Sequence, residues 1–256
     1  MRHIPRKRFA QNFLIDEATI ALIVDAISPR PGDRMVEIGP GLGALTRPLA
    51  GRLEHLHVIE IDRDLVARLR ATFPPDRVTV HEGDALRFDF SALGPRLRVV
   101  GNLPYNISTP LLFELARHAA AIEDIHVMLQ KEVVERMVAR PSTSEYGRLS
   151  VMLQYRFQMA PVLAVAADAF RPSPKVDSAV VRMMPYPRLP HPAADEAALG
   201  KIVAAAFARR RKTLRNALKG YLSAGDFQRL GVDAGLRAQD LKLEDFVRLA
   251  DDLRDG

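Results

Sequence analysis

The residues that could bind a ligand fall into short segments, each at the end of an apolar run. The first segment, GPGLGALT (39–46), contributes Gly39 and Gly41, whose missing side chains let the backbone approach a ligand closely. Glu60 ends a second run, where its carboxylate can accept hydrogen bonds from ribose hydroxyls. Asp84 follows a third run and can accept one from the exocyclic amine of adenine, although a Gly-Asp pair is also common in a solvated turn. The set predicts a nucleoside site.

The segment GNLPYNIS (101–108) places an amide, a proline and an aromatic ring where a fourth apolar run ends. A tight turn alone would account for Asn and Pro. The alternative is a pocket for a flat base, in which the Asn102 side-chain oxygen and the Leu103 carbonyl accept hydrogen bonds from an exocyclic amine. Pro104 would hold that carbonyl in an extended turn, and Tyr105 would offer its ring to the base. Two such acceptors would hold the exocyclic amine of the base in a fixed position.

Elements that could position these residues alternate along the first two thirds of the chain. Short β-branched runs predict strands, and apolar residues three and four apart predict helices. The expected strands are 35–39, 55–61, 78–84, 96–103 and 125–130, and the expected helices are 16–27, 43–53, 62–73, 109–120 and 131–139. This alternation predicts an α/β protein with a Rossmann-like, mostly parallel sheet and helices on both faces. The carboxyl ends of such strands line one crevice, so Gly39, Glu60, Asp84 and Asn102 are expected to converge.

The last third of the chain has a different pattern. The expected elements are a helix over 146–156, strands over 157–165 and 178–185 as an edge hairpin, and later helices of which the first covers 201–222. Prolines over 185–196 mark a linker. We therefore expect one domain with an N-terminal arm over 1–185, which carries the candidate site residues, and a helical domain over 186–256, whose basic residues would serve RNA binding.

The charge of the chain favours a polyanionic partner. The 256 residues carry a formal net charge of +6, with a pI near 9.8. Segment 201–219 holds several cations and no acidic residue, and residues 2–8 form a second basic run. A solvated helix face is the alternative, but so many unopposed cations favour phosphate contacts. The cations are Lys201, Arg209, Arg210, Arg211, Lys212, Arg215 and Lys219 in the first run, and Arg2, Arg6, Lys7 and Arg8 in the second.

Other chemistry is excluded or disfavoured by composition. Cysteine is absent, which excludes disulfides and thiolate chemistry, and the histidines show no metal spacing, so no metal is expected. No stretch approaches the roughly 20 apolar residues that cross a bilayer, and the N-terminus lacks the apolar core of a secretory signal. We expect a cytoplasmic protein that does not bind membranes.

The glycine loop with Glu60 also satisfies the dinucleotide pattern, so an NAD oxidoreductase and a methyltransferase that binds S-adenosylmethionine (SAM) both stay open.

Several motifs, in the same order, resemble the ribosomal RNA adenine dimethyltransferases of the KsgA or RsmA type. They are QNFL (11–14), the glycine loop, the Gly-Asp pair, NLPYNIS and FRPSPKVDSAVVR (170–182). The similarity runs from about Gln11 to the C-terminal helices. NLPY and F-x-P-x-P-K-V-D-S are its specific elements, whereas the glycine loop is generic to SAM-binding folds. Ala10 departs from the family pattern, which usually has Gly there.

The resemblance implies a SAM-dependent enzyme that dimethylates two adjacent loop adenosines near the 3' end of 16S rRNA. In the family pattern, Asn12, the Leu14 backbone and Asn102 would contact SAM, and Phe170 would be a second aromatic residue that closes the base pocket. We expect a monomer that acts on the small ribosomal subunit. Two rivals stay open, namely a 23S rRNA methyltransferase of the macrolide-resistance type and a noncatalytic ribosome assembly factor.

Overall fold

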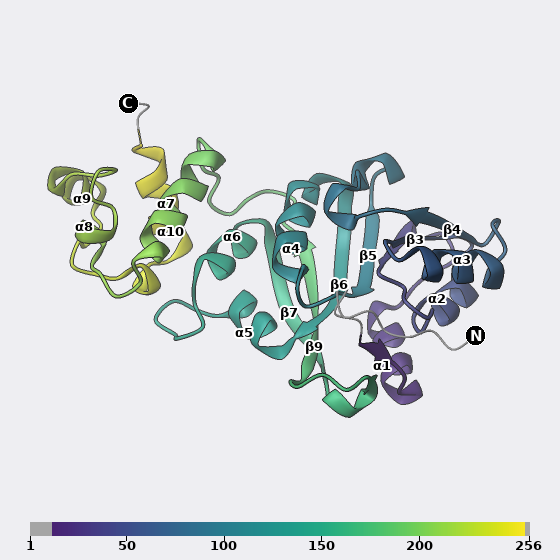
Figure 1. The fold of residues 1–256 in the computed structure, drawn as a ribbon. Helices are drawn as coiled ribbons and strands as arrows, with labels where there is room; N and C mark the ends of the chain where they lie inside the picture. Colours follow the sequence, from purple (N-terminus) through teal and green to yellow (C-terminus); the bar gives the residue numbers. More distant parts are fainter. Residues whose placement is uncertain (1–11, 254–256) are drawn as a thin grey trace. The chain divides into compact units, whose positions relative to one another are not determined.

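The structure, a computed structural model, describes residues 12–253 and divides the chain into two compact units (Figure 1). The first unit comprises the residues up to Val134 together with Gln158–Pro185, and the second comprises Glu135–Phe157 and the residues from Tyr186 onward. None of the helices within residues 12–253 combines the length and the apolar character that crossing a bilayer demands.

A seven-stranded sheet forms the centre of the first unit, with the strand order β4-β3-β2-β5-β6-β9-β7. The strands from β4 to β6 pair in parallel, and β9 runs antiparallel to β6. Their bounds are β2 Met35–Ile38, β3 Leu56–Glu60, β4 Val78–Glu82, β5 Leu97–Asn102, β6 Ile122–Gln130, β7 Phe157–Val165 and β9 Ser178–Pro185. The predicted α/β class and mostly parallel sheet are confirmed. Because the chain returns to the other side of β2 after β4, the loops that follow β2 and β5 flank the point where the strand order reverses.

Helices in the first unit follow the predicted ranges closely, because their caps and apolar spacing are local signals. They are α1 Glu17–Ile27, α2 Thr46–Arg52, α3 Arg63–Thr72, α4 Ser108–Arg117 and α5 Lys131–Val138, the last of which runs into the second unit. The Asp16 carboxylate caps α1 by accepting a hydrogen bond from the Thr19 amide at 2.7 Å. A separate two-stranded sheet pairs β1 (Phe13–Leu14) antiparallel with β8 (Phe170–Arg171).

The second unit is helical and includes a segment that we expected in the first. Its elements are α6 Arg148–Arg156, α7 Glu196–Ala208, α8 Leu214–Ala217, α9 Ala224–Leu230 and α10 Leu243–Asp251. Residues 135–157 belong to this unit, which differs from the expected boundary of 1–185. The physical reason is burial, because Tyr146, Val151 and Tyr155 pack into one apolar core with residues of α7 and α10, such as Ile202 and Phe246.

The predicted single helix over 201–222 is wrong. Helix α7 ends at Ala208, residues 209–213 form turns, and α8 covers only Leu214–Ala217. Two contacts favour the break. The Arg210 guanidinium donates to the backbone carbonyls of Ser144 and Tyr146, and Thr213 forms an antiparallel bridge with Arg237. The basic residues 209–212 therefore lie on a turn and not along a helix face.

Gly101 allows β5 to approach β2 closely, and we expect Gly101→Ala to destabilise the first unit. A Cβ at Gly101 would lie 2.5 Å from the Ile38 backbone oxygen, which no small side-chain movement can relieve. Overpacking of this kind costs about 1–3 kcal/mol of unfolding free energy. The measurement is urea unfolding. Gly51→Ala in α2 is the matched control, because nothing lies within 4 Å of its Cβ position, and a helical Gly→Ala change gains about 0.5–1 kcal/mol. Equal stability of the two variants would contradict the close approach.

Candidate active site

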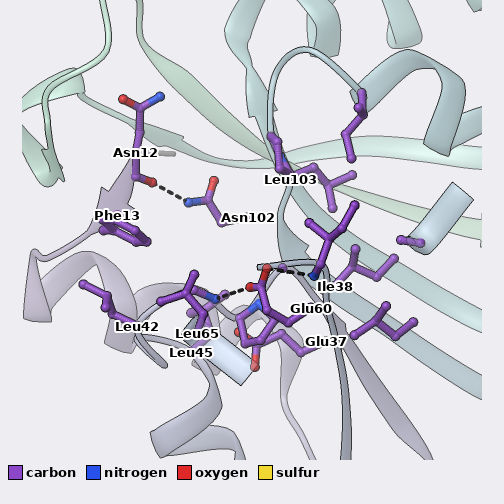
Figure 2. A pocket seen from close by; sticks show the side chains of 18 of the residues that line it. Asn12, Phe13, Glu37, Ile38, Leu42, Leu45, Glu60, Leu65, Asn102 and Leu103 are labelled. Carbon is purple, nitrogen blue, oxygen red and sulfur yellow. Dashed lines mark hydrogen bonds between the residues drawn. The ribbon is translucent and has the colours of Figure 1, made fainter. Parts of the chain in front are cut away.

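A cavity of about 260 Å³ lies at the carboxyl ends of β2, β3, β4 and β5 in the first unit (Figure 2). It brings together most of the site residues that the sequence predicts, from segments far apart in the chain. Those that line it are Asn12, Leu14, Gly39, Gly41, Glu60, Asp84, Asn102, Leu103, Pro104 and Tyr105. Leucine side chains such as Leu42, Leu45 and Leu65 make much of the remaining wall apolar. The predicted convergence of the strand ends therefore occurs.

The glycine loop takes a conformation that ordinary residues rarely adopt. Gly39 and Gly41 have φ values of +66° and +58°, in the left-handed region. A Cβ at Gly41 would also lie 3.2 Å from the Phe13 ring. The loop is thus shaped both by its own glycines and by the arm residue Phe13.

Glu60 holds the glycine loop against the end of β3. One carboxylate oxygen, Oε2, accepts from the Gly41 amide at 3.2 Å, and the other, Oε1, accepts from the Ile61 and Asp62 amides, each at 2.9 Å. The residue is only 6% exposed, and this burial raises the pKa of its carboxyl, while the three amides act in the opposite direction. A carboxylate retains lone pairs beyond these contacts, so Glu60 can still accept from a ligand hydroxyl.

Asp84 both forms a local turn contact and lines the cavity, which are the two alternatives that the sequence left open. Its Oδ1 accepts from the Leu86 amide at 3.0 Å and so caps the short 3-10 helix η2 (Ala85–Arg87). The same residue lines the cavity. A local turn contact therefore directs this carboxyl group and leaves its second oxygen for a ligand.

The side chain of Asn102 is oriented by the N-terminal arm. Its Nδ2 donates to the Asn12 backbone carbonyl at 3.1 Å, so the side-chain oxygen is the atom left to accept from a ligand (Figure 2). Leu103 is almost fully buried, and its amide donates to the Met128 carbonyl at 3.1 Å. What Leu103 can offer a ligand is therefore its own carbonyl. The sequence motif did not reveal the contact with Asn12, which joins residues 90 positions apart.

Tyr105 is held at both of its ends. Its hydroxyl lies 2.7 Å from the Ser178 hydroxyl, and its backbone carbonyl accepts from the Ser108 hydroxyl at 3.0 Å. Burial raises the pKa of the phenol. Tyr105 therefore borders the cavity with its hydroxyl and its backbone both held in place.

Phe170, which the resemblance implied as a second aromatic residue of the base pocket, is buried in the core. It is 2% exposed and packs in the core of the first unit with residues such as Leu14 and Val180. It is not among the residues that line the cavity. The reason is strand pairing, because Phe170 lies opposite Leu14 in the β1-β8 sheet. In this structure Phe170 pairs with the arm, and its part in closing a base pocket stays a prediction.

Glu37 is a cavity residue that the sequence analysis missed. It is only 2% exposed at the end of β2, and the Thr46 hydroxyl donates to its Oε2 at 2.6 Å. Burial, with a smaller contribution from the nearby Glu60 carboxylate, raises the pKa of Glu37 to about 8. The available signal was one acidic residue inside the apolar run MVEI.

We expect the Glu37→Gln variant to gain stability relative to the native protein as the pH rises from 5 to 8. The folded carboxyl keeps its proton up to about pH 8, whereas in the unfolded chain it loses the proton near its ordinary value of 4.5. The contribution of Glu37 to the free energy of unfolding is therefore largest below pH 4.5, and it is lost as the pH rises from 4.5 to about 8. Gln has no such proton, and the expected gain is on the order of 1–3 kcal/mol. Chemical unfolding at several pH values measures it, and a difference independent of pH would show that Glu37 is not perturbed.

The predicted RNA-binding residues lie in the second unit and differ from one another in their contacts. Arg209, Arg210, Arg211, Lys212 and Arg215 are exposed. Arg210 is committed to the carbonyls of Ser144 and Tyr146. Among the residues that the structure describes, Arg211, Lys212 and Arg215 pair with no carboxylate. The basic run Arg2, Arg6, Lys7 and Arg8 lies outside the described residues.

Comparison with known proteins identifies relatives over the whole chain. The family model described as ribosomal RNA adenine dimethylase matches residues 2–255. A protein of Chromobacterium violaceum, named ribosomal RNA small subunit methyltransferase A, is 61% identical over 99% of this chain and 97% of its own length. A protein of Thiobacillus denitrificans with the same name is 61% identical over 95% of this chain and 96% of its own length.

Solved structures share the fold. A dimethyladenosine transferase from Plasmodium falciparum matches with a TM-score of 0.77 and 25% identity, covering 93% of this chain and 95% of its own. The 23S rRNA methyltransferase ErmE matches with a TM-score of 0.72 and 28% identity, covering 94% of this chain and 99% of its own.

Proposed function

The chain belongs to the ribosomal RNA adenine dimethylase family, and from this we propose that it is a SAM-dependent dimethyltransferase of small-subunit rRNA adenosines. The methyl acceptors are the exocyclic amines of two adjacent loop adenosines near the 3' end of 16S rRNA. The observation that carries the proposal is the orientation of Asn102, whose amide nitrogen is bound by Asn12 and whose oxygen is left for a substrate amine. An NAD oxidoreductase would have no use for this acceptor beside NLPY.

The cavity residues fit SAM as the cofactor. The left-handed glycine loop admits a ligand next to the backbone. The Glu60 carboxyl at the end of β3 can accept hydrogen bonds from the ribose hydroxyls of a nucleoside. Gly39, Gly41, Glu60 and Asp84 would hold the nucleoside part, and Asn12 and the Leu14 backbone would cover it. Bound SAM supplies an electrophilic methyl carbon on a sulfonium centre.

Catalysis by the chain itself would consist of orienting and activating the amine. The Asn102 oxygen and the Leu103 carbonyl accept its hydrogen bonds and bring the lone pair out of conjugation with the ring. Tyr105 stacks on the base, which must be splayed out of any helix before it can enter. No strong base is needed, because the amine attacks as a neutral nucleophile and its proton can leave to water.

The small subunit is favoured over the large subunit by the comparisons. The relatives named as small-subunit methyltransferases are 61% identical to this chain, whereas the 23S enzyme is 28% identical. We propose that Arg211, Lys212 and Arg215 contact rRNA phosphates, with Arg209 beside them, and that Arg210 supports the turn that carries them. We further propose a cytoplasmic monomer, and sedimentation of the purified protein tests the monomer.

Incubation with methyl-labelled SAM and 30S subunits that lack the modification tests the function. We expect label in dimethyladenosine of 16S rRNA, and none in matched 50S subunits. Label in 23S rRNA alone would favour the macrolide-resistance type. Binding to 30S subunits with no label in any adenosine would favour the noncatalytic assembly factor. Titration with SAM and with NAD separately tests the cofactor.

A further inference from the structure

The topology of the sheet brings the start of β9 to the edge where the catalytic loop begins. Because β9 runs antiparallel to β6, its first residue, Ser178, lies opposite the last residue of β6, Gln130. Strand β5 is parallel to β6 and ends at the same edge, and its loop carries Tyr105. A residue 73 positions further along the chain thus lies next to the ring that faces the cavity.

Tyr105 and Ser178 are joined by a hydrogen bond between their hydroxyl groups, away from solvent on the Ser178 side. The Tyr105 and Ser178 hydroxyl oxygens are 2.7 Å apart, and Ser178 has no exposed surface. A buried hydroxyl requires a partner, so the pair satisfies both groups. Ser108 fixes the other end of Tyr105 through its backbone carbonyl. The Tyr105 side chain is therefore held at its hydroxyl and at its backbone, which fixes the direction in which the ring extends from the chain.

We propose that Ser178 is a positioning residue, which holds the Tyr105 side chain in the rotamer that places its ring beside the target base for stacking. The proposal rests on the function proposed above, since it assigns Tyr105 the base contact. Stacking requires the ring to lie next to the base, and a Tyr105 side chain without the Ser178 contact could turn to other rotamers. Ser178 itself touches neither base nor cofactor and acts only through Tyr105.

A double-mutant cycle with Tyr105→Phe and Ser178→Ala tests the proposal. Each variant removes one hydroxyl and adds no volume, so both can be expected to fold. If Ser178 acts through Tyr105, each single change lowers kcat on 30S subunits about five- to tenfold, and the double variant is no slower than the slower single variant. The KM for SAM stays at the native value. Tyr155→Phe in the second unit is the matched control, because it removes a partly buried hydroxyl bound to Glu196. It is expected to alter thermal stability but not kcat.

The outcomes separate this proposal from the function itself. A native enzyme that labels no rRNA adenosine would contradict the proposed function. A native enzyme that is active, with single variants at the native kcat, would overturn only the role of Ser178. Losses of kcat that multiply in the double variant would also overturn it, because the two hydroxyls would then act separately. The role of Ser178 would also be overturned if Tyr155→Phe lowered kcat as much as Ser178→Ala for the same loss of thermal stability, because the loss of kcat would then follow from destabilisation alone.

Discussion

Replacing Asn102 by Ala is expected to reduce methyl transfer to 30S subunits by about 10²–10³-fold, the size of effect seen when one aligned hydrogen-bonding group is lost from an active site. The variant removes the acceptor oxygen that the Asn12 carbonyl holds in place through the amide nitrogen at 3.1 Å. SAM affinity should change by no more than several-fold, because Gly39, Gly41 and Glu60 are untouched. Single-turnover kinetics and equilibrium SAM titration measure the two quantities.

Asn102→Asp is the companion variant and separates acceptor strength from orientation. An aspartate keeps an acceptor oxygen but cannot donate to the Asn12 carbonyl, and its charge would favour a cationic cofactor in the ground state. We expect slow transfer with SAM affinity equal to or above the native value. A native rate in Asn102→Ala would show that the amine is activated elsewhere. A native rate in Asn102→Asp would show that the arm does not need to orient this side chain.

Changing Arg211, Lys212 and Arg215 together to Ala is expected to weaken binding to 16S rRNA and to flatten its dependence on salt. Each phosphate contact contributes about 0.7–0.9 to the slope of log K against log salt, so three lost contacts should reduce the slope by about 2–3. Arg210 is left in place because its guanidinium holds the carbonyls of Ser144 and Tyr146. Replacing Arg210 would disturb the turn, so weaker RNA binding could then result from the lost charge or from the altered structure.

A charge-matched control removes the same number of cations elsewhere. Arg30, Arg68 and Arg188 are also exposed, and within residues 12–253 they pair with no carboxylate. Changing these three to Ala alters the net charge equally but should leave the salt slope within about 1 of the native value. Equal slopes for both triple variants would indicate that only total charge matters. An unchanged slope in the Arg211, Lys212 and Arg215 variant would place the phosphate contacts on another surface.

Local signals account for much of the first unit. The strand at 35–38 and the helix at 17–27 were predictable because apolar periodicity and an Asp16 cap act over a few residues. Glu60 and Asp84 followed from the same reasoning, since the ends of parallel strands must share one edge. The helical unit was harder, because residues 135–157 and the turn at 209–213 depend on contacts with distant segments.

The amino-acid sequence by itself determined the set of acceptors and glycines at the strand ends, and with them the expectation of a nucleoside ligand, while the methyl transfer followed from the family motifs. Only the tertiary structure decided how these groups are aimed. The Asn12 carbonyl accepts a hydrogen bond from the Asn102 side chain and so orients it. The Ser178 hydroxyl holds the Tyr105 hydroxyl, and Phe170 pairs with Leu14 in the β1-β8 sheet. The physical reason is sequence separation. Patterns of side-chain type report the local backbone, whereas contacts between residues 73 and 90 positions apart form only when the whole sheet is assembled.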